Sequence, residues 1–345
     1  TQFALVDSLR LNAETRWSGD MERLLTNYVH VATGAVDSKW FRFSNAEAIL
    51  ASSQETTNSP IHTIFSLNTG LVESSGLRAG TNALHASLAH PLPFPTPAAW
   101  LGRLVSPVAQ DRPESARNNT VSGNWHLHSA DVAAGNAVMD TVQLRGSVLT
   151  TTNRAGEASP GFWRVVAPVQ APWEMVVTNI RSGEIEIGSM MANGNWQFPE
   201  LTITSLDAQP HGGHLKANGK LDVVSRKVSA SADAKFSYER ISVLLEKPVQ
   251  RWLAQFTWQE PPAVQADFSL TLPPWTNLTA RFKNEVLPTL YITGKFDGGG
   301  TFRGIPADHA KSSFVFSNYV WRLPDLLVTR PEGQARIDYM GHVAK

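Results

Sequence analysis

The sequence predicts a mainly β protein: an elongated, curved antiparallel sheet built from repeated strand units, with a few short helices. Three observations lead to this fold class. Apolar and polar residues alternate with a period of two along much of the chain, helical patterns are few, and several short phrases occur more than once. Pattern matching gives roughly fifteen to twenty strands.

The clearest alternation runs from residue 227 to residue 236. One face of this predicted strand carries Val228, Ala230, Ala232, Ala234 and Phe236. The residues between them are Ser, Asp and Lys, and because successive side chains of a strand point to opposite faces, the other face is polar. The same rhythm occurs in residues 9–17, 84–88 and 185–187. Gly, Asn, Asp and Pro separate such runs at spacings typical of hairpins.

Two segments have helical patterns. Thr96 and Pro97 are suited to open a short helix over residues 97–105, which Pro107 would end. Apolar residues at helical spacing predict a second helix over residues 238–256, with a kink at Pro248. Residues 51–60, 106–119 and 151–160 are polar and are predicted to be loops.

Several phrases recur along the chain. WQFPELTIT at residues 196–204 is matched by WRLPDLLVT at residues 321–329. The triplet GNW begins at Gly123 and again at Gly194, and GKLD at Gly219 is matched by GKFD at Gly294. Trp40 begins a further strand-like run. This spacing indicates degenerate strand–turn–strand units of roughly 70 residues, each with a Trp-led strand and a glycine-marked turn.

Strands with one apolar face need something against that face. A two-sheet sandwich and a closed barrel are both possible solutions. Repetition favours a third, a long curved sheet whose apolar concave side is occupied by another molecule, because each unit then needs only its neighbour. The small residues Ala86, Ala230, Ala232 and Ala234 favour it too, since they leave room on the apolar face. We therefore predict that residues Val228, Ala230, Ala232, Ala234 and Phe236 form part of an apolar groove face.

We divide the chain into an N-terminal β-repeat segment, residues 1–120, and a C-terminal β-repeat segment, residues 121–345. The first contains the predicted helix near 97–105 and the second the one near 238–256. The chain begins at Thr1 without a signal segment and ends at Lys345 just after a strand-like run. We expect one continuous elongated piece of a longer protein, whose membrane anchor lies outside this sequence.

Charge and cysteine content exclude several classes of function. Thirty basic side chains balance thirty acidic ones, so no positive surplus is present to neutralise nucleic-acid phosphates. The absence of cysteine excludes disulfides, thiolate metal sites and a catalytic thiol. The sequence contains no run of about 18 apolar residues, so it predicts no membrane-spanning helix.

Some phrases resemble those of the AsmA-like family of bacterial envelope proteins. They are the W-x-L-P-D-L-x-V pattern at 321–328, GGHLKANGKLDV at 212–223, FSYERISVLLEKPVQRWL at 236–253 and GKFDGGGTFRG at 294–304. The resemblance covers roughly residues 190–340. It implies an inner-membrane-anchored protein whose periplasmic part is a long β groove that carries phospholipid toward the outer membrane. The family has no catalytic residues to transfer, and this sequence does not contain the family's N-terminal membrane helix.

Possible chemical sites are few. His126 and His128 share one face of a predicted strand, a spacing that some zinc sites use, but no third ligand is marked. His211 and His214 flank a predicted turn and are interpreted as solvated. Residues 298–300 are three glycines without the Lys-Ser/Thr ending of a phosphate loop, so a bulge or a turn with positive φ is predicted. No GxSxG or HExxH motif is present.

Together these patterns predict a non-enzymatic lipid conduit with no cofactor, whose partners are phospholipid acyl chains and inner- and outer-membrane proteins. An alternative is a surface-exposed β-repeat protein that binds carbohydrate or protein through its eleven tryptophans. Trp40, Trp125, Trp196 and Trp321 recur at what we interpret as equivalent strand starts, which indicates packing rather than ligand contact. A β-helical polysaccharide-degrading enzyme is a third possibility, but the short regular rungs that it requires are not seen.

Overall fold

The fold is known from a computed structural model. It describes residues 4–19, 24–38, 41–56, 59–90, 121–151, 163, 166–183, 185–237, 250, 254–275 and 282–342. Their strands form one antiparallel sheet of twenty strands, so the prediction of a mainly β, antiparallel fold is confirmed. The chain divides into two compact units, unit 1 (residues 1–179 and 195–198) and unit 2 (residues 180–194 and 199–345). The predicted division at residue 120 stays a prediction.

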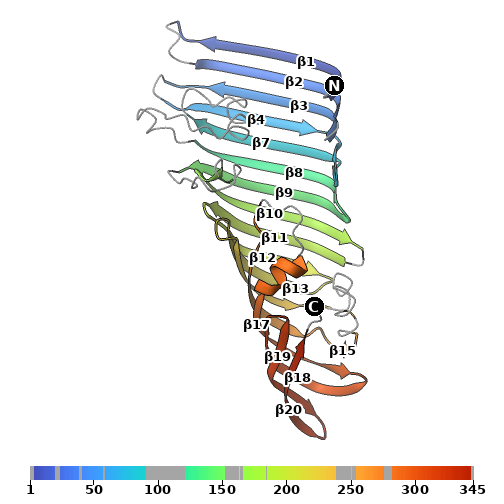
Figure 1. Ribbon diagram of the computed structural model, residues 1–345. Coiled ribbons are helices and arrows are strands. Elements are labelled where there is room, and N and C mark those ends of the chain that lie inside the picture. The colour runs from blue at the N-terminus through green and yellow to red at the C-terminus, as the bar shows by residue number, and fades with distance from the viewer. Residues whose placement is uncertain are drawn as a thin grey trace. The chain divides into compact units, whose positions relative to one another are not determined.

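The first ten strands are β1 (Ala4–Trp17), β2 (Leu24–Ser38), β3 (Phe41–Ser53), β4 (Ile61–Thr69), β5 (Val72–Ser74), β6 (Leu77–Ala79), β7 (Thr81–His90), β8 (Ser122–Ala134), β9 (Ala137–Thr150) and β10 (Val169–Ser182). Figure 1 shows β1 to β4 and β7 to β9 laid side by side in chain order. The short strands β5 and β6 extend the sheet where β4 ends and β7 begins, because β5 pairs with β3 and β6 pairs with β8.

The second ten are β11 (Ile185–Gln197), β12 (Glu200–Pro210), β13 (His214–Asp222), β14 (Lys227–Lys235), β15 (Phe256–Trp258), β16 (Ala263–Thr271), β17 (Tyr291–Phe302), β18 (Ile305–Ser317), β19 (Val320–Arg330) and β20 (Gly333–His342). Two short helical turns, η3 (Phe282–Val286) and η4 (Leu287–Thr289), precede β17. Strand β14 pairs with β13 on one side and with β16 on the other.

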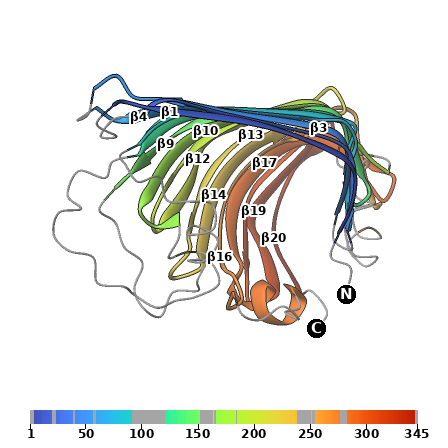
Figure 2. The same cartoon turned by 90° about the horizontal axis from the view of Figure 1, so that it is seen from above.

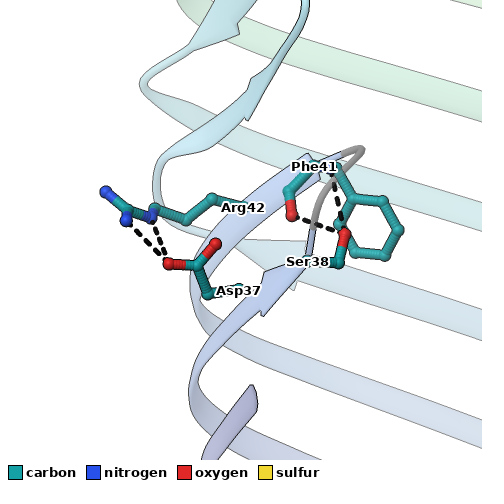
Figure 3. Close-up of polar contacts among 4 residues, drawn as sticks. All are labelled: Asp37, Ser38, Phe41 and Arg42. Carbon is teal, nitrogen blue, oxygen red and sulfur yellow. Dashed lines mark hydrogen bonds and ion pairs between the residues drawn. The ribbon is translucent and has the colours of Figure 1, made fainter. Parts of the chain in front are cut away.

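Polar contacts fix the register where β2 meets β3. The Arg42 guanidinium donates to Asp37 Oδ2 through Nε at 3.2 Å and Nη2 at 2.7 Å (Figure 3). The hydrogen bond from Asp37 and its negative charge raise the pKa of Arg42. Ser38 Oγ donates to the Phe41 carbonyl at 2.9 Å and accepts from the Phe41 amide at 3.0 Å. Asp37 and Arg42 are also direct cross-strand partners, so both faces of this hairpin end are held in one alignment.

A row of turn-forming residues bends the strands of unit 1. Ser8 in β1, Asn45 in β3, Asp131 in β8 and Asn179 in β10 all have φ between 49° and 52°, although each lies inside a strand. Gly34 of β2 lies beside Ser8 and donates its amide to Ser8 Oγ at 3.1 Å. Small and Asn/Asp residues tolerate this left-handed conformation best, and it redirects a strand without ending it. Figure 2 shows β1 and β3 turning sharply toward one end.

Unit 2 is shaped by bulges instead. The pairing register shifts between Ile203 and Leu206 in β12, between Gly298 and Gly300 in β17, and between Leu323 and Leu326 in β19. A bulge adds a residue to one strand, and this increases the local bend and twist. The predicted bulge at the three glycines is therefore confirmed. The predicted positive φ is wrong there, because the positive-φ glycines lie elsewhere.

The helix predictions are only partly covered by the described residues. The helix predicted near 97–105 and most of the one near 238–256 lie outside them, as do Trp40 and the predicted loops 106–119 and, apart from Thr151, 151–160. Phe256, the predicted end of the second helix, begins strand β15 and pairs with Phe302. Residues 51–53, predicted as loop, complete strand β3.

None of the helices in the described part of the chain combines the length and the apolar character needed to cross a bilayer.

Candidate functional site

The candidate groove residues are brought together by strand β14. Val228, Ala230, Ala232 and Ala234 lie on one face of it, as the alternation predicts, and Phe236 follows the strand's end. The first three are half-buried, whereas Ala234 and Phe236 are buried. Because cross-strand partners in an antiparallel sheet share a face, the register shows which residues surround them.

Apolar residues continue from β14 across the neighbouring strands in rows. We call this surface the apolar face of unit 2. Its rows are Leu201–Leu221–Val228–Leu270, Ile203–Gly219–Ala230–Phe268–Ile292–Phe316–Trp321, Leu206–Ala217–Ala232–Ala266–Gly294 and Ala208–Leu215–Ala234–Val264–Phe296. The rows run across the strands, so apolar surface is continuous from one strand to the next.

Small side chains form a low strip within this face. Ala217, Ala232, Ala266 and Gly294 occupy one row on β13, β14, β16 and β17. The row beside it, through Ala234, carries the larger residues Leu, Val and Phe. Three steps between strands at about 4.8 Å give the strip a length of about 14 Å. Ala and Gly carry the smallest side chains, so the described residues of this row project less from the sheet than those of the row through Ala234.

Aromatic rings close the strip at β18. A Cβ added at Gly294 would lie 2.4 Å from Cζ of Phe314, so the Phe314 ring lies against this glycine. The Trp321 ring lies 5.9 Å from that of Phe314 and 4.7 Å from that of Phe316, measured between centroids. Phe316 is only 2% exposed. Among the described residues, aromatic side chains thus fill the β18–β19 end of the apolar face.

The opposite face of the same strands is polar. One of its rows is Asp207–Lys216–Asp233–Gln265–Lys295, and Gln265 donates to Asp233 at 2.8 Å. The Ser231 hydroxyl donates to the Asp267 carboxylate. Two hollows, of about 540 and 890 Å³, are lined mainly by side chains of this polar face. They therefore lie on the side away from the predicted apolar groove, and they are not that groove.

Unit 1 has an equivalent surface, which we call the apolar face of unit 1. Its rows are Leu11–Val31–Ala48–Leu67–Leu84–Leu127–Leu144 and Ala13–Val29–Leu50–Phe65–Ala86–Trp125–Gly146. From β2 to β9 these residues are half-buried. The Trp125 ring lies against Gly146, where an added Cβ would come within 2.8 Å of it. Sequence alternation had marked Leu84, Ala86 and Leu88, but not the strands that flank them.

Three buried polar side chains form a hydrogen-bonded cluster at the border of the apolar face of unit 1. His90, 2% exposed, lies 2.8 Å through Nε2 from Thr63 Oγ1, which is 2.8 Å from Ser52 Oγ. All three side chains are buried, and they satisfy one another's hydrogen-bonding capacity. This arrangement orders the sheet where β3, β4 and β7 meet, and sequence reasoning gave no sign of it.

The histidine pairs do not form a metal site among the described residues. His126 and His128 share a face of β8, as predicted, and His85 of β7 lies opposite His126. His211 lies in a turn, and His214, at the start of β13, lies 3.5 Å from Asp233. Nevertheless, no group of three or more His, Asp or Glu side chains with metal-binding geometry occurs in the described part of the chain.

The recurring tryptophans do not occupy equivalent positions. Trp321 is the second residue of β19 and Trp125 the fourth of β8, but Trp196 lies at the end of β11. The prediction of equivalent strand starts is therefore wrong for Trp196. Its indole donates to the Val166 carbonyl at 2.9 Å and its ring stacks on Trp163 at 5.6 Å. Both contacts are packing contacts, as the repetition had suggested.

Asp325, from the second copy of the repeated phrase, anchors the bulge in β19. Its Oδ1 accepts hydrogen bonds from the Ser313 amide and hydroxyl, each at 2.8 Å, and from the Ser312 hydroxyl at 3.1 Å. The hydrogen bonds from Ser313 come first among the causes that lower the pKa of Asp325, and the charge of Arg336 adds to them. Glu200, the matching residue of the first phrase, begins β12 and lies 3.4 Å from Lys220 instead.

Replacement of Asp325 by Asn is expected to destabilise unit 2 at neutral pH and to matter less in acid. A lowered carboxyl pKa contributes stability above the ordinary value of about 3.9, and that contribution is lost as pH falls through the folded-state pKa. Urea unfolding of Asp325→Asn and wild type between pH 7 and pH 3 measures this. Asp308→Asn, at an exposed position on β18, is the control. If the difference in unfolding free energy between Asp325→Asn and wild type stayed constant with pH, the stabilising role of the Asp325 carboxylate would be contradicted.

No family model, curated protein or solved structure matches this chain. The AsmA-like resemblance therefore stays a prediction from the sequence.

Proposed function

We propose that this chain is a non-enzymatic protein of the bacterial cell envelope that carries phospholipid along its apolar faces. In this proposal it lies in the periplasm, anchored to the inner membrane by a segment outside this chain. There it moves phospholipid between the inner and outer membranes and supports outer-membrane biogenesis. Its partners would be acyl chains and inner- and outer-membrane proteins. The balanced charge of the sequence gives no support for nucleic acid as a partner.

One observation carries the proposal. In each unit the described strands form a single layer, and most side chains of its apolar face are half-buried rather than fully buried. The core of a filled sandwich would bury them completely. An acyl chain laid across the rows would cover the same side chains without any specific polar contact.

The apolar rows would also allow a bound acyl chain to move along the sheet. Full exposure of an acyl chain to water would cost about 0.8 kcal/mol per methylene group. Because the apolar rows continue from each strand to its neighbour, a methylene group that leaves one contact gains the next, so displacement along the rows changes the buried area little. The polar face of unit 2, with its row of Asp, Lys and Gln, offers no such surface to hydrocarbon.

Replacement of Ala232 by Glu tests the proposal. We expect phospholipid that co-purifies with the chain from a Gram-negative host to fall more than about tenfold, because an unpaired polar group against hydrocarbon costs over about 1.4 kcal/mol. The measurement is lipid extraction and quantification per mole of protein. Ser229→Glu is the matched control: it lies on the same strand but on the polar face, in register with Lys220. Circular dichroism confirms that both variants fold.

The outcomes are distinct. Phospholipid bound to wild type and to Ser229→Glu, but lost from Ala232→Glu, supports the proposal. A wild-type protein that carries no phospholipid but binds glycans on an array would support the carbohydrate-binding alternative instead. Equal loss of lipid in both variants would show that the apolar face of unit 2 is not where lipid binds.

A further inference from the structure

The hollow of about 540 Å³ on the polar face of unit 2 has a floor made of two neighbouring cross-strand rows. We call it the polar hollow. Its rows are Asn218–Ser231–Asp267–Thr293 and Lys220–Ser229–Ser269–Tyr291, each with one residue on β13, β14, β16 and β17. Three steps between strands at about 4.8 Å give each row a length of about 14 Å. The floor is therefore a plate of polar side chains that lies on the central strands of the sheet and not at its edges.

The floor is rich in groups that both donate and accept hydrogen bonds. Its two rows carry five hydroxyls and one amide, beside one carboxylate and one ammonium group. Among the described residues, Asp267 accepts a hydrogen bond from the Ser231 hydroxyl. A carboxylate has about four acceptor sites, so Asp267 keeps capacity to accept from a ligand. Asp267 and Asn218 are both exposed, and a ligand in the polar hollow can reach them.

The charges of the polar hollow favour an uncharged ligand. Lys220 is the one cation among the residues that line it, and its Nζ lies 3.4 Å from Glu200. Asp267 contributes a negative charge to the same floor. A phosphate, sulfate or carboxylate ligand is held by cationic donors without such compensation, and would meet the Asp267 carboxylate here.

Tyr291 adds a flat ring to one end of the floor. It is the first residue of β17, lies opposite Ser269 on the polar face, and is 47% exposed. Tyrosine offers a large, rigid contact surface with an apolar body and a polar tip. This ring, and not any of the tryptophans, is the aromatic group on the floor of the polar hollow.

We propose that the polar hollow binds a neutral oligosaccharide. The Tyr291 ring lies against the C–H face of one sugar, while Asp267 accepts from sugar hydroxyls and Asn218 both donates to them and accepts from them. Sugars match this floor because each hydroxyl donates and accepts, and because the ring also has an apolar C–H face. A row of about 14 Å is longer than a single sugar ring, which favours an oligosaccharide over a monosaccharide.

The same strands disfavour a peptide added to the sheet. Strands β13, β14 and β16 are each paired on both sides, so their backbones are not available to a further strand. The polar hollow lies on the face opposite the apolar face of unit 2, so this proposal does not depend on lipid carriage.

Calorimetric titration of the whole chain tests the proposal, with maltohexaose, cellohexaose and N-acetylchitohexaose as neutral probes. We expect saturable binding of at least one of them, and weaker or no binding of the anionic hexagalacturonate. Asp267→Asn keeps an acceptor for Ser231 but removes the charge that strengthens the bonds to the sugar. We expect it to raise the dissociation constant at least about tenfold.

Variants of Tyr291 test the ring separately. Tyr291→Ala is expected to raise the dissociation constant at least about tenfold, whereas Tyr291→Phe keeps the ring and should change it less than about threefold. The matched controls are Asp308→Asn, an exposed carboxylate of β18 outside the polar hollow, and Tyr28→Ala, a 38% exposed tyrosine of unit 1. Both should bind like wild type, and circular dichroism verifies that every variant folds.

The proposal is overturned if none of the three neutral hexasaccharides binds, or if hexagalacturonate binds more tightly than they do. It is also overturned if Asp267→Asn and Tyr291→Ala bind like wild type, or if the two controls lose as much affinity. Phospholipid content, measured in parallel, is expected to be equal in Asp267→Asn and wild type. A chain that carries phospholipid but binds no hexasaccharide would refute this proposal alone, and a lipid-free chain that binds one would refute only lipid carriage.

Discussion

Replacing Phe316 by alanine is expected to lower the free energy of unfolding of unit 2 by about 3–5 kcal/mol, because this ring is the most completely buried aromatic side chain of the apolar face. Phe316 is 2% exposed, its centroid lies 4.7 Å from that of Trp321, and it lies opposite Ile292 of β17. Truncation removes the buried ring surface and leaves a cavity that the flanking strands cannot fill without changing their spacing.

The measurement is denaturant unfolding combined with amide hydrogen exchange, which reports β17, β18 and β19 separately from unit 1. Phe302→Ala is the control. Phe302 is an aromatic residue of the neighbouring strand β17, and its ring centroid lies 4.9 Å from that of Phe256. Unlike Phe316, it is 43% exposed. Truncation of Phe302 should lower the free energy of unfolding by less than half as much as truncation of Phe316. Equal losses in the two variants would mean that Phe316 does not hold β18 to its neighbours.

The alternation of β14 was sufficient to predict its two faces. Val228, Ala230, Ala232 and Ala234 share a face because the side-chain period of a strand is two, which is a local property. The neighbours of Ala232 are not local. Ala217 and Ala266 belong to strands separated from it by turns and by other chain, and only the register brings them beside it. The small-residue strip is therefore a property of the pairing and could not be predicted from one strand.

The bends of unit 1 were missed for a different reason. Ser8, Asn45, Asp131 and Asn179 interrupt apolar alternation, and in a sequence such residues indicate a turn that ends a strand. Here one residue with positive φ changes the direction of the strand, and pairing resumes on the far side. A signal was nevertheless present, since polar turn-formers with strand-like sequence on both sides recur in several predicted strands.

The recurring phrases predicted repetition but not its structural meaning. Pro199 lies in the turn between β11 and β12, whereas Pro324 lies at the bulge inside β19. The glycines of GKLD and GKFD, predicted to mark turns, lie inside β13 and β17. Similar sequence is thus used at different positions of the strand unit.

Gly294→Ala is expected to destabilise unit 2 by about 1–3 kcal/mol, although alanine normally suits a strand better than glycine. The added Cβ would lie 2.3 Å from the Gln265 carbonyl oxygen and 2.4 Å from Cζ of Phe314, so the backbone of β16 and a packed ring must both move. Gly188→Ala in β11 is the control in the same unit. No atom lies within 4 Å of its added Cβ, and its φ is not positive, so we expect no loss of stability or a small gain. Denaturant unfolding of the two variants measures the difference. If both variants were stabilised alike, Phe314 would not lie against Gly294, and the small-residue strip would continue past β17.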